Sequence, residues 1–182
     1  MKIRILTALL AASTVLSTSA MASLDIGYEL GATKFASAGL TKTRPNNMFR
    51  IGYMNEAGLG VDGIYAYIPK TKFGYADYQS DYKVRMFKVM AKYRKPFGEK
   101  FSALARAGVG FEHVTNNLNA PSYIVKSTIE RYFPTFSGGA YYNVTEQVSL
   151  GVNVHYDARS HYRFSENVYP TIGINYTIPS SI

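Results

Sequence analysis

The sequence predicts an all-β protein: an eight-stranded antiparallel transmembrane β-barrel with short periplasmic turns and long extracellular loops. Three observations lead to this prediction. Apolar and polar residues alternate with a period of two over eight separate segments, which is typical of strands with two different faces. The connections between these segments are alternately short and long along the chain. One face of the strands is rich in glycine and charge, and the other is rich in aliphatic and aromatic side chains.

The first four strands are expected at residues 24–33, 49–54, 59–67 and 87–94. In the first, Leu, Ile, Tyr, Leu and Ala alternate with Asp, Gly, Glu, Gly and Thr, and in the second, Phe, Ile and Tyr alternate with Arg, Gly and Met. In the third, Leu, Val and two Tyr alternate with Gly, Asp, Ile and Ala. In the fourth, Phe, Val, Ala and Tyr alternate with Lys, Met, Lys and Arg. Each pattern predicts a strand that separates an apolar from a polar environment.

The last four strands are expected at residues 101–112, 134–143, 148–157 and 168–178. In the fifth, Phe, Ala, Val and Phe alternate with Ser, Leu, Arg, Gly and Glu. In the sixth, Pro, Phe, Gly, Ala and Tyr alternate with Thr, Ser, Gly, Tyr and Asn. In the seventh, Val, Leu and Tyr alternate with Ser, Gly, Asn, His and Asp. In the eighth, Val, Pro, Ile and Tyr alternate with Tyr, Thr, Gly and Asn. An even number of antiparallel strands can close into a barrel.

The lengths of the connections indicate which way such a barrel is oriented. Short connections fall at residues 56–58, 95–100 and 144–146, whereas long ones cover residues 37–46, 69–81, 113–130 and 158–167. Bacterial outer-membrane barrels have short periplasmic turns and longer extracellular loops. The pattern therefore predicts that both termini lie in the periplasm.

The N-terminus has the features of a secretory signal peptide. Lys2 and Arg4 precede the apolar run 5–16, and the small residues Ala20 and Ala22 form a cleavage site. The apolar run is too short to span a bilayer as a helix. We therefore expect a signal peptide at residues 1–22, a single barrel domain at residues 23–182, and export to the cell outer membrane of a Gram-negative bacterium.

The composition narrows the classes of function. The chain has 182 residues, 20 Lys and Arg against 12 Asp and Glu, three His and no Cys. The absence of Cys excludes disulfides, thiolate zinc sites and a cysteine nucleophile, and the three His are too scattered to predict a metal site. An exported basic protein rarely meets nucleic acid, so the charge favours anionic lipid or polysaccharide as a partner. No cofactor is expected.

The two faces of the strands decide between a membrane barrel and a soluble one. The polar face carries many glycines, which suit the crowded interior of a small barrel, and a set of charges that could neutralise one another there. This predicted barrel-interior charge network consists of Glu29, Arg50, Asp62, Lys88, Lys92, Arg106 and Glu112. The apolar face carries aromatic residues near the strand ends, which is typical of the girdles of a membrane barrel: Tyr53, Tyr67, Tyr93, Phe101, Phe111, Tyr142, Tyr156 and Tyr176. A soluble barrel would instead carry polar residues suited to water on that polar face.

Three segments resemble OmpA/OmpX-like eight-stranded outer-membrane β-barrels. They are VMAKYRKPFGEKFSALARAGVG at residues 89–110, GGAYYNVTEQVSLGVNVHY at residues 138–156, and the last strand, TIGINYTI, at residues 171–178. The last of these resembles the signal read by the barrel-assembly machinery, although Ile178 stands where the family usually has a terminal aromatic residue. The resemblance implies the fold, the outer-membrane location and this assembly partner.

Basic residues gather in or beside the predicted long loops, where the outer leaflet presents lipid A phosphates. Arg and Lys both bind phosphate well. The sequence therefore predicts contact with lipopolysaccharide and outer-membrane lipids by a set of cations: Lys70, Lys72, Lys83, Arg85, Arg131, Arg159 and Arg163. The leading interpretation is a monomeric barrel with a structural or surface-interaction role and no catalytic residues.

The sequence leaves two other functions open. His155 and Asp157 lie on one strand face, close to Ser160 and His161, and lipid A deacylases of the PagL type use a Ser–His pair on a similar barrel. Their His-x-Ser-Asn motif is missing, because His155 is followed by Tyr and Asp. A small pore is the other alternative, although eight strands leave an interior only wide enough for side chains.

Overall fold

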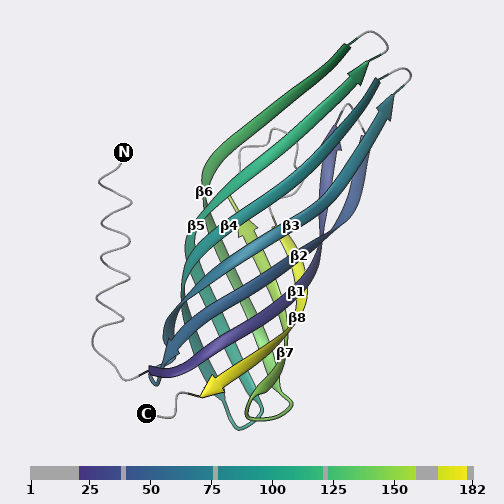
Figure 1. Cartoon of the computed structure of the whole chain (residues 1–182). Helices are drawn as coiled ribbons and strands as arrows, with labels where there is room; N and C mark the ends of the chain where they lie inside the picture. Colours follow the sequence, from purple (N-terminus) through teal and green to yellow (C-terminus); the bar gives the residue numbers. More distant parts are fainter. Residues whose placement is uncertain (1–20, 38–39, 76–77, 121–122, 159–167, 180–182) are drawn as a thin grey trace, which may run out of the picture.

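The computed structural model describes residues 21–37, 40–75, 78–120, 123–158 and 168–179, which form a single closed barrel (Figure 1). Its strands are β1 (Met21–Ser37), β2 (Leu40–Asn55), β3 (Leu59–Tyr75), β4 (Tyr78–Phe97), β5 (Phe101–Ala120), β6 (Tyr123–Asn143), β7 (Val148–Asp157) and β8 (Val168–Pro179). Residues 1–20 of the predicted signal peptide lie outside the described residues, whereas Met21 and Ala22 belong to β1. The described residues include no helix that is long and apolar enough to cross a membrane.

Every strand pairs antiparallel with its neighbours in sequence, and β1 closes the barrel against β8. The closing register runs from Ser23 opposite Pro179 to Gly31 opposite Thr171. The strand order is therefore β1 to β8 around the barrel without any crossover. The predicted fold class, an eight-stranded antiparallel barrel, is confirmed.

The strands extend further than the sequence predicted. Residues of three segments that were expected to be long loops are paired strands instead. The β1–β2 pairing continues to Ser37 and Leu40, the β3–β4 pairing to Tyr75 and Tyr78, and the β5–β6 pairing to Ala120 and Tyr123. Alternation of polarity marks a strand only where its two faces meet different environments, so the pattern fades where both faces are polar. Of the fourth predicted loop, residues 159–167 lie outside the described residues.

The two ends of the barrel differ. The short connections at residues 56–58, 98–100 and 144–147 lie at one end, together with the start of β1 and the end of β8 (Figure 1). We call this the turn end, and the opposite one the hairpin end. In the first turn the Gly58 amide donates to the Asn55 carbonyl at 3.0 Å. Gly58 has a φ of +79°, and a β-carbon there would lie 2.2 Å from the Arg94 carbonyl oxygen, so glycine is required.

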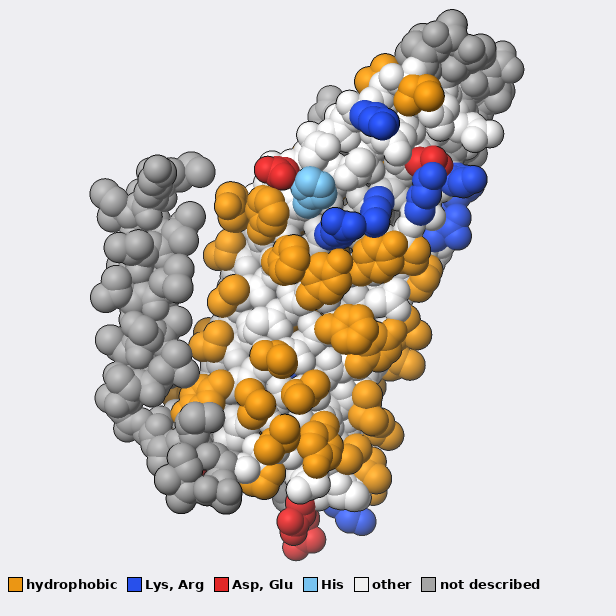
Figure 2. All heavy atoms as spheres, in the orientation of Figure 1, with side chains coloured by type: hydrophobic (Ala, Val, Ile, Leu, Met, Phe, Trp, Pro, Cys, Tyr) orange, Lys and Arg blue, Asp and Glu red, His pale blue; other side chains and the backbone are white. Residues whose placement is uncertain are grey.

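All eight strands contribute exposed apolar side chains to a band on the outer wall, which we call the apolar belt; Figure 2 shows one face of it. Aliphatic residues such as Ile51, Val89 and Val152 are about 60% exposed within it. The aromatic residues expected at the girdles all lie half-buried or exposed on this outer surface. Cross-strand aromatic pairs include Phe101–Tyr142, with ring centroids 5.3 Å apart, and Phe111–Tyr132, with centroids 5.1 Å apart. Such a surface suits a lipid environment rather than water.

The inside of the barrel is filled by side chains. An apolar cluster occupies part of it and consists of Met48, Ile64, Ala66, Ile68, Tyr82, Val84, Met86, Met90, Val114, Phe133 and Tyr169. Phe133 fits because Gly110 lies opposite it on β5, where a β-carbon would come within 2.4 Å of the Phe133 ring. Apart from Leu104 and Tyr141, the other large side chains of the described interior are polar or charged.

Candidate functional site

Charged residues from five strands meet inside the barrel in what we call the central charge network: Asp25, Glu29, Arg50, Asp62, Lys92 and Arg106. Asp62 lies between the Lys92 Nζ atom at 2.9 Å and the Arg106 Nε atom at 2.9 Å, and Arg50 is 3.5 Å away. Glu29 accepts from both terminal nitrogens of Arg106 at 3.2 Å. All of these side chains are almost completely buried, so each charge depends on its partners.

Lys88 belongs to a separate group rather than to the central charge network. Its Nζ atom donates to Asp157 at 2.6 Å and to the Tyr169 hydroxyl at 2.8 Å. The Tyr169 hydroxyl in turn donates to Asp157 at 2.9 Å, and the Thr135 hydroxyl donates to the same carboxylate at 2.6 Å. This group connects β4, β6, β7 and β8 across the barrel interior.

Glu112 forms a third buried ion pair, with Arg131 of β6, which lies directly opposite it on the neighbouring strand. The sequence had assigned Arg131 to contact with lipopolysaccharide. In the structure the Arg131 side chain is 21% exposed and turned toward the Glu112 carboxylate. Arg131 therefore contributes to the inner wall of the barrel rather than to its outer surface.

His155 is fully buried inside the barrel. Its Nε2 atom is 2.9 Å from the Glu29 carboxylate and 3.2 Å from the Thr171 hydroxyl, and its ring stacks on Tyr169 with centroids 5.2 Å apart. Ser160 and His161 lie outside the described residues. Among the described residues, no group of three or more His, Asp or Glu side chains is arranged to hold a metal ion.

A cluster of cations lies on the outer wall just beyond the apolar belt, on the side of the hairpin end (Figure 2). Lys83 and Arg85 are the outward-facing residues of β4 that come next to Phe87 of the belt. Together with Lys70, Asp81, Thr115 and Asn117 they line an open hollow of about 300 Å³, which we call the cationic hollow.

Within the cationic hollow, one acid partly balances the bases. The Lys70 Nζ atom lies 2.6 Å from Asp81, and the Lys70 side chain is still 53% exposed. The Lys83 Nζ atom lies over the Tyr67 ring at 5.8 Å from its centroid. Lys83 and Arg85 form no ion pair with a described residue within 4.0 Å. Their charge is therefore directed at the hollow and the solvent.

The remaining predicted contact residues are not part of this hollow. Lys72 is exposed on β3 beyond it, and the Lys42 Nζ atom donates to the Lys72 backbone carbonyl at 2.6 Å. Arg159 and Arg163 lie outside the described residues. The structure thus brings together Lys70, Lys83 and Arg85 from the predicted set.

Several contributing residues were not identified from the sequence. Asp25 and Asp157 pair with Lys92 and Lys88, respectively, although both already had a place on the predicted polar face. Thr115 and Asn117 line the cationic hollow because the β4–β5 pairing extends as far as Gln79, which lies opposite Asn119. The sequence of this strand extension lacks the alternation of polar and apolar residues from which the strands were predicted, so residues 113–130 were predicted as a loop.

Comparison with known proteins identifies the family. The family described as "Outer membrane protein beta-barrel domain" matches residues 7–164 of the chain. The chain matches no curated protein sequence.

Several solved structures share the fold. The chain is similar to Neisserial surface protein A, at 15% identity over 85% of this chain and 97% of that one, with a TM-score of 0.62. It is similar to Ail, the attachment invasion locus protein of Yersinia pestis, in complex with the heparin analogue sucrose octasulfate, at 13% identity over 87% and 100%, with a TM-score of 0.64. The N-terminal β-barrel domain of Pseudomonas aeruginosa OprF matches at 14% identity over 87% and 98%, with a TM-score of 0.63. With a matched family covering most of its length and a closed barrel wrapped in an apolar belt, this chain belongs to the outer-membrane β-barrel protein family.

Proposed function

We propose that this protein is a surface-interaction barrel of the outer membrane that binds the phosphates of lipopolysaccharide through its cationic hollow. The observation that carries this proposal is the position of Lys83 and Arg85. They precede Phe87 on the outward face of β4, toward the hairpin end, so they lie where the apolar belt ends and lipid headgroups begin. A phosphate there would meet two cations without an internal acid partner.

The chemistry of the cationic hollow suits a phosphate group. Arg85 offers a planar fork of donors, Lys83 and Lys70 offer ammonium groups, and Thr115 and Asn117 add neutral hydrogen-bonding groups. Hydrogen bonds between charged partners are about twice as strong as neutral ones. The structure of Ail with sucrose octasulfate supports the proposal, because it shows that a barrel of this fold can bind a polyanion.

In this proposal the hairpin end faces the cell exterior and the turn end, with both termini, faces the periplasm. Short turns on the periplasmic side are the rule in bacterial barrels. The protein acts as a monomer and is inserted by the barrel-assembly machinery, which reads the last strand. The β1–β8 closure supports a monomer, since each strand has two partner strands within the chain in the closed part of the barrel.

We propose neither catalysis nor a pore. His155 is enclosed by Glu29, Thr171 and Tyr169 inside the barrel, so it does not face a lipid substrate. The apolar cluster and the central charge network fill the lumen. A structural and surface-binding role is therefore the better candidate.

The proposal is tested by measuring lipid A binding to the refolded barrel in detergent. The variant Lys83→Gln/Arg85→Gln removes two charges from the hollow. Each basic group near an anionic surface contributes about 1 kcal/mol, so binding should weaken by roughly 30-fold at low salt and by less at high salt. Lys95→Gln/Lys100→Gln is the matched control, because it removes the same charge from exposed positions at the turn end.

Dephosphorylated lipid A serves as the control ligand. It should bind the parent barrel and the Lys83→Gln/Arg85→Gln variant with equal affinity, because it lacks the phosphates that the two cations would contact. Equal losses in the two double variants would show a general charge effect and would contradict the assigned site. Cleavage of an acyl chain from lipid A by the parent barrel would contradict the non-enzymatic part of the proposal.

A further inference from the structure

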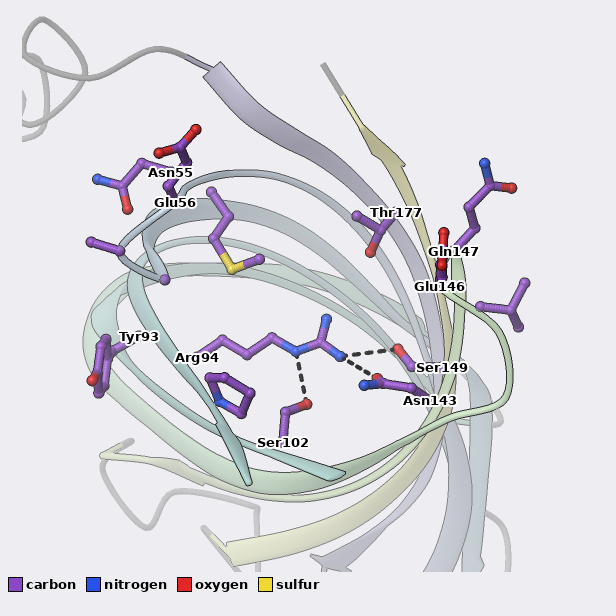
Figure 3. Close-up of a pocket in the computed structure, with 15 residues that line it drawn as sticks. Asn55, Glu56, Tyr93, Arg94, Ser102, Asn143, Glu146, Gln147, Ser149 and Thr177 are labelled. Carbon is purple, nitrogen blue, oxygen red and sulfur yellow. Dashed lines mark hydrogen bonds between the residues drawn. The ribbon is translucent and has the colours of Figure 1, made fainter. Parts of the chain in front are cut away.

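Arg94 of β4 occupies the mouth of the barrel at the turn end (Figure 3). Its Nε atom donates to the Ser102 hydroxyl at 2.9 Å, and its Nη2 atom donates to the Asn143 side-chain carbonyl at 2.9 Å and to the Ser149 hydroxyl at 3.5 Å. Its guanidinium lies over the Tyr141 ring, 5.3 Å from the centroid. Three strands thus hold the guanidinium in one orientation.

The partners of Arg94 set it apart from other cations of the interior. Arg50, Lys88, Lys92 and Arg106 each lie within 4.0 Å of at least one carboxylate oxygen. In the described residues, Arg94 bonds only to neutral oxygens and has no ion pair. A partly buried charge without a counter-charge is costly, so the site would be stabilised by an anion.

The neighbouring acids do not fill this role. Asp25 acts electrostatically on Arg94, but its carboxylate is bound by Lys92 at 2.6 Å and by the Thr177 hydroxyl at 2.8 Å. Glu56 and Glu146 border the mouth with exposed side chains, and neither forms an ion pair with Arg94. The Nη1 atom of Arg94 has no hydrogen bond to any described residue.

A cavity of about 340 Å³ opens beside the guanidinium toward the turn end. This is within the size range of small-molecule pockets, which starts near about 300 Å³. Its wall offers the polar side chains of Asn55, Gln147 and Thr177, and short apolar contacts come from Met54, Pro96 and Val148. In Figure 3, Arg94 lies across the opening, and the labelled Asn55, Gln147 and Thr177 lie around its rim.

We infer that this mouth is a binding site for a small organic carboxylate, with Arg94 as the group that binds the carboxylate. The pre-oriented guanidinium provides the charge and the Nη1 donors, and the mixed polar and apolar wall favours an organic molecule over a bare ion. Ser102, Asn143 and Ser149 are positioning residues, because they hold the guanidinium and leave Nη1 directed at the cavity.

The test uses the full refolded barrel in detergent and isothermal titration with three probes: tri-alanine, tri-alanine amide and inorganic phosphate. Tri-alanine carries a terminal carboxylate, and its amide has the same size without that charge. We expect tri-alanine to bind at least tenfold more tightly than the amide. Arg94→Gln should remove this difference, whereas Lys95→Gln, which deletes the neighbouring exposed charge, should keep it.

Equal binding of tri-alanine and its amide would overturn the inference, and so would unchanged binding by Arg94→Gln. Binding of inorganic phosphate without binding of tri-alanine would show a simple counter-ion site and would equally overturn it. If Arg94→Gln does not fold, the site is tested in the parent protein instead, by following the NMR resonance of the Arg94 Nε–H group. That resonance should shift on addition of tri-alanine and stay in place on addition of the amide; a shift with both would refute the site.

Discussion

Arg106 joins the two carboxylates that organise the charged interior, Glu29 on β1 and Asp62 on β3. Replacing Arg106 with Leu would leave both acids buried with one cation fewer. Loss of one partner of a buried ion pair costs about 3–5 kcal/mol, so we expect the free energy of unfolding in urea to fall by that order. Val109→Leu, on the lipid-facing side of the same strand, is the control and should be nearly neutral. An Arg106→Leu barrel as stable as the parent would mean that the network does not stabilise the fold.

Gly110 makes room for the Phe133 ring inside the barrel. We expect Gly110→Ala to destabilise the barrel by about 1–3 kcal/mol, because the new methyl group would overlap the ring. Combining it with Phe133→Leu should cost less than the sum of the single changes, since the smaller side chain relieves the overlap. Gly138→Ala is the control: a β-carbon there would lie 3.7 Å from its nearest neighbour, the Leu104 carbonyl oxygen. Strictly additive effects in urea unfolding would contradict this packing.

At the residue scale, the sequence specified which face a side chain takes but not which partner it meets. Alternation assigned Lys88 and Lys92 to the same interior, and both are buried there. Their acids are nevertheless different, Asp157 for Lys88 and Asp25 for Lys92. These partners come from strands on the other side of the lumen, and the pairing depends on the stagger of all the strands around the barrel. That stagger is a property of the closed sheet and is not encoded in any single segment.

The hairpins give the elements of the barrel a direction that can be measured. If the hairpin end lies outside the cell, a cysteine at Thr128 of β6 should react with a membrane-impermeant maleimide on intact cells. A cysteine at Glu99, in the β4–β5 turn, should react only after the outer membrane is permeabilised. Both positions are exposed, and the chain has no natural cysteine, so the parent provides a clean background. The reverse labelling pattern would refute the orientation.

The extended strands are the elements that the sequence did not reveal. Residues 113–120 contain the polar run Asn116, Asn117 and Asn119, which reads as a loop because Asn is depleted in strands. In the structure these residues pair with both β4 and β6. Inside the membrane each strand separates lipid from lumen and the alternation is clear, whereas beyond it polar and apolar residues are mixed without a regular period, as at Ile124, Val125 and Lys126. The pattern thus predicted the membrane-spanning portions well and the extensions poorly.

One edge of the extended sheet is protected by several features together. Above Tyr67, β3 has no partner on its β2 side among the described strands, since the β2–β3 register ends at Asn47 opposite Tyr67. The β3–β4 register shifts between Ile68 and Thr71, and Pro69 within this stretch has no amide hydrogen to donate. The Lys42 ammonium donates a hydrogen bond to the Lys72 backbone carbonyl. Bulges, proline and lysine are the usual means by which proteins prevent edge-to-edge aggregation.

For the whole molecule, the filled lumen predicts that the barrel does not conduct ions. The apolar cluster around Phe133 and the paired charges around Asp62 leave no polar path through the described interior. Purified protein reconstituted in planar bilayers should show no stepwise current at the voltages where a porin does. An inner-membrane-free porin preparation in the same bilayer is the positive control. Reproducible single-channel current steps whose frequency rises with protein concentration would contradict this prediction and show that the side chains in the lumen leave a conducting path.

The global architecture was the part best predicted from the sequence. Eight alternating segments, short turns on one side and an aromatic outer face led to a membrane barrel, and the closed β1–β8 order confirms that fold class. The cationic hollow was only partly predictable, because Lys70, Lys83 and Arg85 converge through the β3–β4 register while Thr115 and Asn117 arrive from β5. Charge composition predicts an anionic ligand, whereas the positions of the cations relative to one another depend on the three-dimensional strand pairing.

The β6–β7 pairing starts at Thr135 opposite Asp157, so among the described strands the upper part of β6 is bonded only to β5. The Ala158 amide donates to the Pro134 carbonyl, which shows that the even-numbered residues direct their backbone groups away from β5. Amides bonded within a sheet are protected from exchange with solvent deuterium, and unbonded ones are not. Along residues 124–133, NMR should therefore record rapid exchange at Lys126, Thr128 and Glu130 and slow exchange at the odd-numbered residues between them. Uniformly slow exchange would show that something pairs with this edge in solution.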